Sequence, residues 1–262
     1  MCRFLAYRGD PVFMEDLVCS PRHSLIHQSL HAEEAKVATN GDGFGLGWYG
    51  ERREPGVYRE LRPAWSDENL LSLCRLVRAH VFFAHVRAAT GTATMRANCH
   101  PFTFERWMFM HNGQIGGYGL IRRRLEALLP DALYASRAGT TDSELVFLLI
   151  VGRIEAGESP VEATAGVLRT VKELMSEANV SEPLRFNAAI TDGETVFAFR
   201  AACDDRPPSL YVCERPEAAI IASEPLDQDR SCWREIPKGV AVVMGRGGMR
   251  IEPDFWSRVA RH

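Results

Sequence analysis

The sequence lacks the features that mark several common classes of protein. No stretch of its 262 residues approaches the roughly 18 consecutive apolar residues of a membrane-spanning helix. Neither sign of charge dominates, because 31 Lys and Arg face 34 Asp and Glu for a net charge of -3. This balance argues against binding of nucleic acid or anionic membranes through bulk electrostatics. The chain also opens without a basic and apolar leader. We therefore predict a cytoplasmic protein that binds neither nucleic acid nor membrane.

The cysteines follow no pattern of a disulfide framework or a zinc site. They are odd in number and widely spaced, and no pair has the Cys-x-x-Cys spacing of thiolate-rich metal sites. We expect most of them to be small, buried, apolar residues. His85, His100 and His111 match no common zinc spacing either, so we expect them in the core or behind a site. No metal and no cofactor is predicted.

The order of patterned segments is strands, then helices, then strands. No linker or low-complexity block divides the chain, so we predict one domain over residues 1–262. Short runs rich in aromatic and β-branched residues, bounded by turn residues, predict strands. These expected strands cover residues 3–8, 44–49, 80–87, 106–111, 185–191, 195–200, 209–213, 218–223, 239–244 and 248–252.

Three helices are expected in the middle of the chain. Apolar residues recur with helical spacing over residues 118–129. Thr141-Asp142-Ser143-Glu144 has the spacing of a capping box and predicts a helix over residues 142–155. Ser159-Pro160 combines a capping residue with proline at the first helical position, so a third helix begins there.

This order favours two packed sheets covered by helices over a parallel doubly wound sheet, which alternates strand and helix. Residues 45–50 do match the Gly-x-Gly-x-x-Gly pattern of dinucleotide-binding loops. However, the charged segment that follows is not the apolar helix which that motif requires. We therefore reject dinucleotide binding.

Cys2 stands out by its position. An initiator methionine is generally removed when the next side chain is small, and Cys2 would then be the first residue. A terminal cysteine joins a thiol of reference pKa about 8.5 to an amine of about 8, so one residue holds a nucleophile and a base. The alternative is that cysteine stands at this position by chance.

His111-Asn112-Gly113 follows the apolar strand over residues 106–110, where we expect a turn. An Asn side-chain amide and a Gly backbone N–H are suitable donors for the oxyanion that forms when a carboxamide is attacked. An ordinary Asn-Gly turn is the other interpretation.

Arg87 and Asp142 are candidates for binding an amino-acid zwitterion. A guanidinium at the end of a strand binds a carboxylate through two parallel hydrogen bonds, and a carboxylate pairs with an ammonium group. Arg87 in a surface ion pair remains open, as does Asp142 acting only on the dipole of its helix.

Together these residues resemble the class II glutamine amidotransferase domain, a family of N-terminal-nucleophile hydrolases. The matching segments occur in the same order along nearly the whole chain. They cover residues 1–5, 40–45, 85–91, 98–102, 111–113, 140–144, 222–226 and 236–239.

The resemblance implies an α+β fold, a four-layer αββα sandwich of two antiparallel sheets between helices. It also implies that Cys2 is the nucleophile, with its own amine as base, and that Asn112 and Gly113 form the oxyanion hole. Arg87 would bind the substrate α-carboxylate and Asp142 its α-amine, while Thr90 would support the pocket.

Two departures suggest the stand-alone members of the family. Arg3 and Ala88 replace the glycine-containing stretch and the tryptophan that are usual in sugar-linked members. The stand-alone members include the hydrolase that trims a γ-glutamyl group during ergothioneine synthesis.

We therefore predict an amidohydrolase that cleaves the γ-carboxamide of glutamine or of another small γ-glutamyl amide through a thioester intermediate. One alternative is a glutaminase subunit that supplies ammonia to a separate synthase partner. Another is a catalytically silent binding module on the same scaffold.

Overall fold

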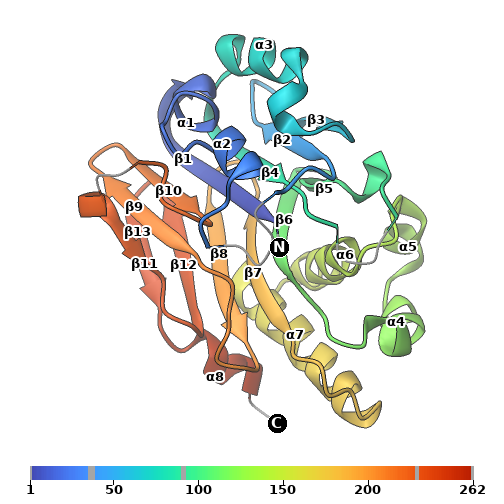
Figure 1. Ribbon diagram of the computed structural model, residues 1–262. Helices are drawn as coiled ribbons and strands as arrows, with labels where there is room; N and C mark the ends of the chain where they lie inside the picture. Colours follow the sequence, from blue (N-terminus) through green and yellow to red (C-terminus); the bar gives the residue numbers. More distant parts are fainter. Residues whose placement is uncertain (1, 35–38, 90–92, 228–229, 261–262) are drawn as a thin grey trace.

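The computed structural model describes residues 2–34, 39–89, 93–227 and 230–260. They form two stacked sheets with helices on the outer faces (Figure 1). The strand order is β11-β9-β10-β1-β4-β2-β3 in the first sheet and β13-β12-β8-β7-β6-β5 in the second. Every strand pair in both sheets is antiparallel. This arrangement confirms the predicted α+β sandwich.

The bounds of the elements are as follows. The first sheet contains β1 (Arg3–Phe13), β2 (Phe44–Trp48), β3 (Gly56–Glu60), β4 (Arg78–Val86), β9 (Tyr211–Arg215), β10 (Ala218–Ala222) and β11 (Trp233–Glu235). The second contains β5 (Phe102–Phe104), β6 (Trp107–Gln114), β7 (Arg185–Thr191), β8 (Val196–Ala202), β12 (Val240–Gly245) and β13 (Gly248–Glu252). The helices are α1 (Glu15–Val18), α2 (Leu25–Leu30), α3 (Glu68–Leu76), α4 (Tyr118–Glu126), α5 (Asp131–Ser136), α6 (Asp142–Glu155), α7 (Pro160–Glu177) and α8 (Phe255–Ala260).

Alternation along the strands divides the core into layers. On β1, Leu5 packs with the apolar residues of α1 to α3, whereas Phe4 and Ala6 belong to the cluster between the two sheets. On β6, Met110 faces that same middle cluster, and Phe109 packs against α6 and α7. Successive strand residues point to opposite faces of the sheet. Within a strand, the parity of a residue, that is, whether its number is odd or even, therefore fixes the layer it faces. Each fully buried large side chain stabilises the fold by about 1.5–3 kcal/mol.

The two strongest helix signals are confirmed. The Thr141 hydroxyl accepts a hydrogen bond from the Glu144 backbone N–H at 3.1 Å, at the start of α6. The Ser159 hydroxyl does the same for Glu162 at 3.3 Å, at the start of α7. The Glu144 carboxylate does not close a capping box, because it accepts from the backbone N–H groups of residues 138 and 139 instead.

One prediction of local structure is wrong, and it concerns the candidate site. The segment from His111 to Gly113 was expected to be a turn, but it lies inside β6, which continues to Gln114. Asn112 pairs with Asn187 and Gly113 with Phe186 on β7. Pairing with a strand more than 70 residues away overrides the local turn preference of Asn-Gly. The backbone of Asn112 is therefore held by the regular β6–β7 ladder.

A disulfide joins Cys213 on β9 to Cys232, directly before β11, so the expectation from the odd number and wide spacing of the cysteines was wrong for this pair. The β9–β11 pairing places these two residues side by side, with their Cα atoms 5.0 Å apart. Cys74 and Cys99 are buried free thiols, as expected.

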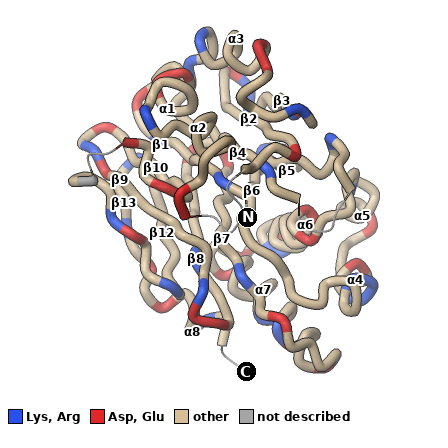
Figure 2. The backbone as a smooth tube through the Cα atoms, in the orientation of Figure 1, with Lys and Arg blue, Asp and Glu red and all other residues tan. Residues whose placement is uncertain are grey.

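No helix in the described parts of the chain has the length and apolar character needed to cross a bilayer. Charged residues of both signs are spread over the elements (Figure 2).

Candidate active site

A cavity of about 330 Å³ opens where β1, β4, β6 and the N-terminus of α6 meet. Its wall includes Cys2, Arg87, Gly113 and Asp142. The structure therefore brings together four of the predicted site residues, which come from four separate segments of the chain. Thr90 lies outside the described residues.

Cys2 immediately precedes β1 and is half-buried. It shares parity with Phe4 and Ala6, so its side chain is on the side of the sheet that faces the second sheet. Its Sγ atom lies 3.6 Å from the Ala88 carbonyl oxygen. Burial raises the pKa of the Cys2 thiol despite the opposing effect of that contact. The thiol therefore needs an adjacent base to become a nucleophile near neutral pH.

Asn112 lies on β6 and has no exposed surface. It has the parity of Met108 and Met110, so it points into the layer between the sheets that Cys2 also faces. Among the described residues, neither its Nδ2 nor its Oδ1 has a hydrogen-bond partner. Each buried polar group left unpaired costs about 1–3 kcal/mol. An amide kept at that cost beside a cavity is suited to bind a ligand oxygen.

Gly113 is required by its surroundings. A Cβ atom at this position would lie 2.0 Å from the Arg185 carbonyl oxygen and 2.5 Å from His111 Nε2. The backbone of β6 therefore approaches β7 and the ring of His111 more closely than any side chain allows. This close approach leaves the Gly113 segment on the cavity wall.

We expect Gly113→Ala to lower the free energy of unfolding by at least about 1–3 kcal/mol, because the new methyl group forces β6 away from the rigid β7 backbone. Gly119→Ala in α4 is the matched control, since a Cβ there meets nothing within 4 Å. It should instead raise the unfolding free energy by about 0.5–1 kcal/mol. Urea unfolding of both variants measures the difference, and equal stabilities would contradict the steric argument.

Arg87 follows β4 and is only 3% exposed, which excludes the surface ion pair. The β1–β4 register pairs Arg3 with Val86, so Arg87 stands opposite Cys2 where the ladder ends. Its Nη1 donates to the Asp42 carbonyl oxygen at 3.3 Å and its Nη2 to the Ala93 carbonyl oxygen at 3.4 Å. These contacts hold the guanidinium at the cavity wall.

Asp142 is the first residue of α6. Its Oδ2 accepts from the Ile115 backbone N–H at 2.9 Å, and its Oδ1 accepts from the Ser143 backbone N–H at 2.7 Å. The two bonds fix the carboxylate at the rim between the end of β6 and the start of α6. A carboxylate has about four acceptor sites, so these bonds are compatible with a further one from an ammonium group.

Three buried histidines surround the cavity, and the sequence indicated them only as core or supporting residues. His100 and His111 line the wall, and the rings of His85 and His100 lie 4.1 Å apart. His85 Nε2 donates to the His111 carbonyl oxygen at 3.3 Å, while His111 Nδ1 lies 2.8 Å from the Ser143 hydroxyl. No group of His, Cys, Asp and Glu in the described parts of the chain is arranged to hold a metal ion.

Burial holds all three imidazoles neutral near pH 7. It lowers the pKa of His85 to about 3, and it lowers the pKa values of His100 and His111 as well. The positive charge of Arg87 lowers the pKa values of His85 and His100 further. None of the three is therefore an effective base or acid for chemistry at Cys2 near neutral pH.

These shifts predict acid sensitivity. In the unfolded chain a histidine has a pKa of about 6.5, so the unfolded state takes up protons first as the pH falls. The free energy of unfolding should therefore fall as the pH drops below about 6.5, with about 2 kcal/mol lost at His85 by pH 5 and further losses at His100 and His111. Urea unfolding at pH 8 and pH 5 measures this, and His85→Gln should remove about 2 kcal/mol of the loss. An unchanged pH dependence in that variant would contradict the assignment.

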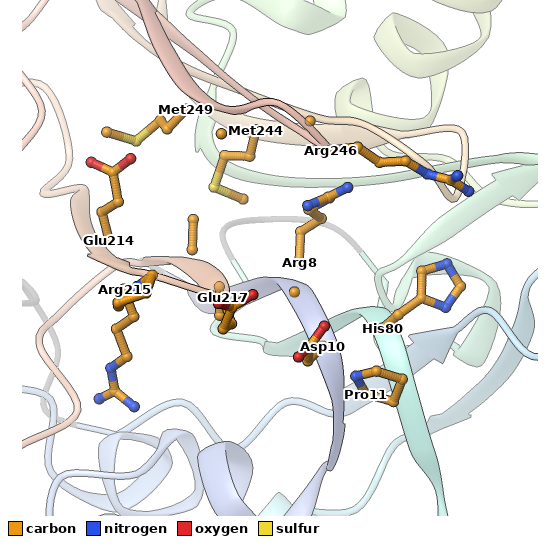
Figure 3. A pocket seen from close by; sticks show the side chains of 16 residues that line it. Arg8, Asp10, Pro11, His80, Glu214, Arg215, Glu217, Met244, Arg246 and Met249 are labelled. Atoms are coloured by element: carbon orange, nitrogen blue, oxygen red, sulfur yellow. The ribbon is translucent and has the colours of Figure 1, made fainter.

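A second cavity, of about 400 Å³, lies at the opposite ends of β1 and β4. Its wall includes Arg8, His80, Glu217 and Met244, which Figure 3 shows around the opening. None of the predicted site residues that the structure describes lines it. The chemical groups that the sequence singled out therefore gather at the smaller cavity beside Cys2.

Comparison with known proteins points to one family. The family model described as class II glutamine amidotransferases matches residues 16–217. The probable glutamine amidotransferase DUG3 of Saccharomyces cerevisiae is 30% identical over 97% of this chain and 84% of its own length. The γ-glutamyl-hercynylcysteine sulfoxide hydrolase of Mycolicibacterium smegmatis is 29% identical over 90% of this chain and 92% of its own length. A solved class-II glutamine aminotransferase domain protein from Silicibacter pomeroyi has a TM-score of 0.76 at 33% identity, over 96% of this chain and 97% of that one.

Proposed function

This chain belongs to the class II glutamine amidotransferases, and from that premise we propose that it hydrolyses a γ-glutamyl amide by means of an N-terminal cysteine. The observation that carries the proposal is the meeting of Cys2, Arg87, Gly113 and Asp142 on one cavity, with the buried Asn112 amide on the adjoining strand β6. Each of the five supplies one function that the reaction needs.

Binding of the substrate rests on two opposite charges. Arg87 pairs with the α-carboxylate of the γ-glutamyl group, and Asp142 accepts hydrogen bonds from its α-ammonium. Both side chains are held by backbone contacts, so little of their mobility is lost when the substrate binds. Thr90 supports the same pocket in this proposal. With its α-carboxylate and α-ammonium bound by Arg87 and Asp142, the substrate directs its γ-carbonyl toward Cys2.

The reaction proceeds in two halves once Met1 has been removed. The α-amine of Cys2 takes the thiol proton while Sγ forms a bond to the carbonyl carbon of the γ-amide, and the carbonyl oxygen becomes an oxyanion. Asn112 Nδ2 and the Gly113 backbone N–H donate to that oxyanion. The α-ammonium returns its proton to the leaving nitrogen as the C–N bond breaks, which leaves a γ-glutamyl thioester. Water, deprotonated by the amine, then attacks the thioester and releases glutamate and the free thiol.

The α-amine is the base that suits this environment. A free terminal amine has a reference pKa of about 8, whereas burial lowers the pKa values of the nearby His85, His100 and His111. A base must titrate near the working pH to transfer protons in both directions. The amine is also attached to the same Cα atom as the thiol side chain, so its position relative to Sγ needs no second residue.

The experiment combines a substrate panel with covalent labelling. Purified protein is assayed for glutamate release from glutamine and from γ-glutamyl amides with larger leaving groups, because one relative is named for such a hydrolysis. An electrophilic glutamine analogue should label Cys2 stoichiometrically and in preference to the other free cysteines. Iodoacetamide, which carries no glutamyl group, should not prefer Cys2. Cys203 is the exposed free thiol among the described residues, and Cys203→Ala serves as the matched control for labelling. Absence of both glutamate release and Cys2 labelling would refute the proposal.

A further inference from the structure

A nucleophile at the end of a chain needs something to hold it. Cys2 precedes the first paired residue of β1, and residues at chain ends fray unless they are tied down. Displacement of a reacting group by 1 Å can cost about 100-fold in rate. The contacts that restrain Cys2 therefore bear directly on the proposed reaction.

Arg3 and Glu224 face each other two residues beyond Leu5 and Ala222, the last pair of the β1–β10 ladder. The register Leu5↔Ala222 continues to Arg3 opposite Glu224, and the Ser223 backbone N–H donates to the Phe4 carbonyl oxygen at 3.0 Å. Arg3 Nε donates to Glu224 Oε1 at 2.6 Å, with both side chains at most 1% exposed.

The guanidinium of Arg3 also reaches back to the nucleophile's own backbone. Its Nη1 donates to the Cys2 carbonyl oxygen at 3.0 Å. Arg3 has the parity of Leu5, so its side chain lies on the helix-covered face of the first sheet, opposite to the face that carries the Cys2 thiol. Arg3 is absent from the cavity wall. It therefore restrains the main chain of Cys2 without contacting the place where the substrate binds.

Glu224 is itself held by several groups. Its Oε2 lies 2.8 Å from His23 Nε2, and it accepts from the backbone N–H groups of Glu33 and Glu34, each at 3.0 Å. Burial alone would raise the pKa of Glu224, but His23, the charge of Arg3 and the two N–H groups lower it to about 2. The carboxylate stays ionised and immobile. A buried ion pair contributes little stability compared with apolar side chains of similar size, so its geometry is the better explanation for it.

We propose that the Arg3–Glu224 pair is a positioning device for the N-terminal nucleophile. Glu224 fixes the guanidinium, and the guanidinium fixes the Cys2 carbonyl. The amine and the side chain that bears the thiol are both attached to the Cys2 Cα atom, so this contact restricts the orientation of both toward the γ-carbonyl. The inference rests on the proposed function, and it assigns to Arg3 and Glu224 a role in turnover rather than in substrate binding.

The test compares Arg3→Lys and Glu224→Gln with the wild type. Lysine keeps the positive charge but loses the planar fork that holds a carboxylate and a carbonyl together. Glutamine keeps the shape of the carboxylate and removes its charge. We expect kcat for γ-glutamyl hydrolysis to fall roughly 10- to 100-fold, with KM within about threefold of the wild type. The maximal rate of labelling by an electrophilic glutamine analogue should fall in parallel, with its half-saturating concentration unchanged.

Two further variants guard against a purely structural effect. Arg258→Lys alters another multiply paired arginine, which contacts Glu162, Glu252 and Asp254 far along the chain, and it should leave kcat unchanged. Ser223→Ala removes only the acceptor for the Phe4 backbone N–H and is the milder variant if the charge variants do not fold. It should lower kcat several-fold at unchanged KM.

The outcomes separate the two proposals. A folded Arg3→Lys, or Ser223→Ala in its place, that keeps wild-type kcat and labelling rate would overturn the positioning role while the proposed function stands. A loss confined to KM would overturn it too. If the wild type neither releases glutamate nor becomes labelled, the proposed function fails, and the positioning role falls with it.

Discussion

Cys2→Ala is expected to lower kcat for glutamate release by at least about 10,000-fold, because the variant has no sulfur to form the thioester. The loss should appear with folding intact, since the thiol is half-buried and its contact with the Ala88 carbonyl is a weak one. Steady-state assays with purified variant, together with a thermal unfolding curve, measure both quantities.

The matched control for this experiment is Cys99→Ala. Cys99 is a buried thiol close to the candidate site, and its pKa is raised by burial, yet it is absent from the cavity wall. It should retain activity within about tenfold. Cys2→Ala with more than a few per cent of wild-type activity would show that another group attacks the substrate.

Asn112→Ala should lower kcat by about 100- to 1,000-fold, the usual cost of removing one donor from an oxyanion hole. The physical reason is the buried amide, whose Nδ2 lacks a partner among the described residues. Because the variant loses no hydrogen bond to the described residues and removes an unpaired buried amide, the free energy of unfolding should not fall by more than about 1 kcal/mol. Kinetics and urea unfolding of the same preparation measure the two effects.

Asn187→Ala supplies the contrast. Asn187 stands opposite Asn112 in the β6–β7 ladder, but its Nδ2 donates to the carbonyl oxygens of Pro208 and Ser209 at 2.7 and 3.1 Å. Its removal should cost about 1–3 kcal/mol of stability, with a much smaller effect on kcat than Asn112→Ala. A reversed pattern, with Asn112 important for stability and not for turnover, would assign Asn112 to the core.

Local sequence signals predicted those parts of the fold that depend on neighbouring residues. The capping residues Thr141 and Ser159 fix the starts of α6 and α7 through hydrogen bonds three residues along the chain. Short elements such as α1, α5 and β11 carry no comparable signal, because they are stabilised mainly by the tertiary surfaces they cover. The apolar spacing predicted a helix over residues 118–129, and Ile121 and Leu125 of α4 are buried, but the helix ends at Glu126 and Leu128 is exposed.

Residues on the wall of the candidate site could be named from the sequence, whereas the strand pairing and the ion pair that hold them in place could not. Cys2, Arg87, Gly113 and Asp142 were named from the sequence, and the structure brings them to one cavity. The sequence did not indicate that Asn112 and Gly113 are held within the β6–β7 ladder, because this pairing joins residues more than 70 positions apart. The Arg3–Glu224 pair was missed for the same reason, since its members are 221 residues apart and Arg3 was noted only as a departure from relatives. No local period or spacing links such residues.

The most direct test of the central claim is the intact mass of the protein after labelling by an electrophilic glutamine analogue. The account requires the thiol and the free amine to belong to the same first residue. It predicts that the labelled, active molecules all begin at Cys2, and that any fraction that still carries Met1 stays unlabelled and inactive. Full activity and full labelling in molecules that retain Met1 would contradict it.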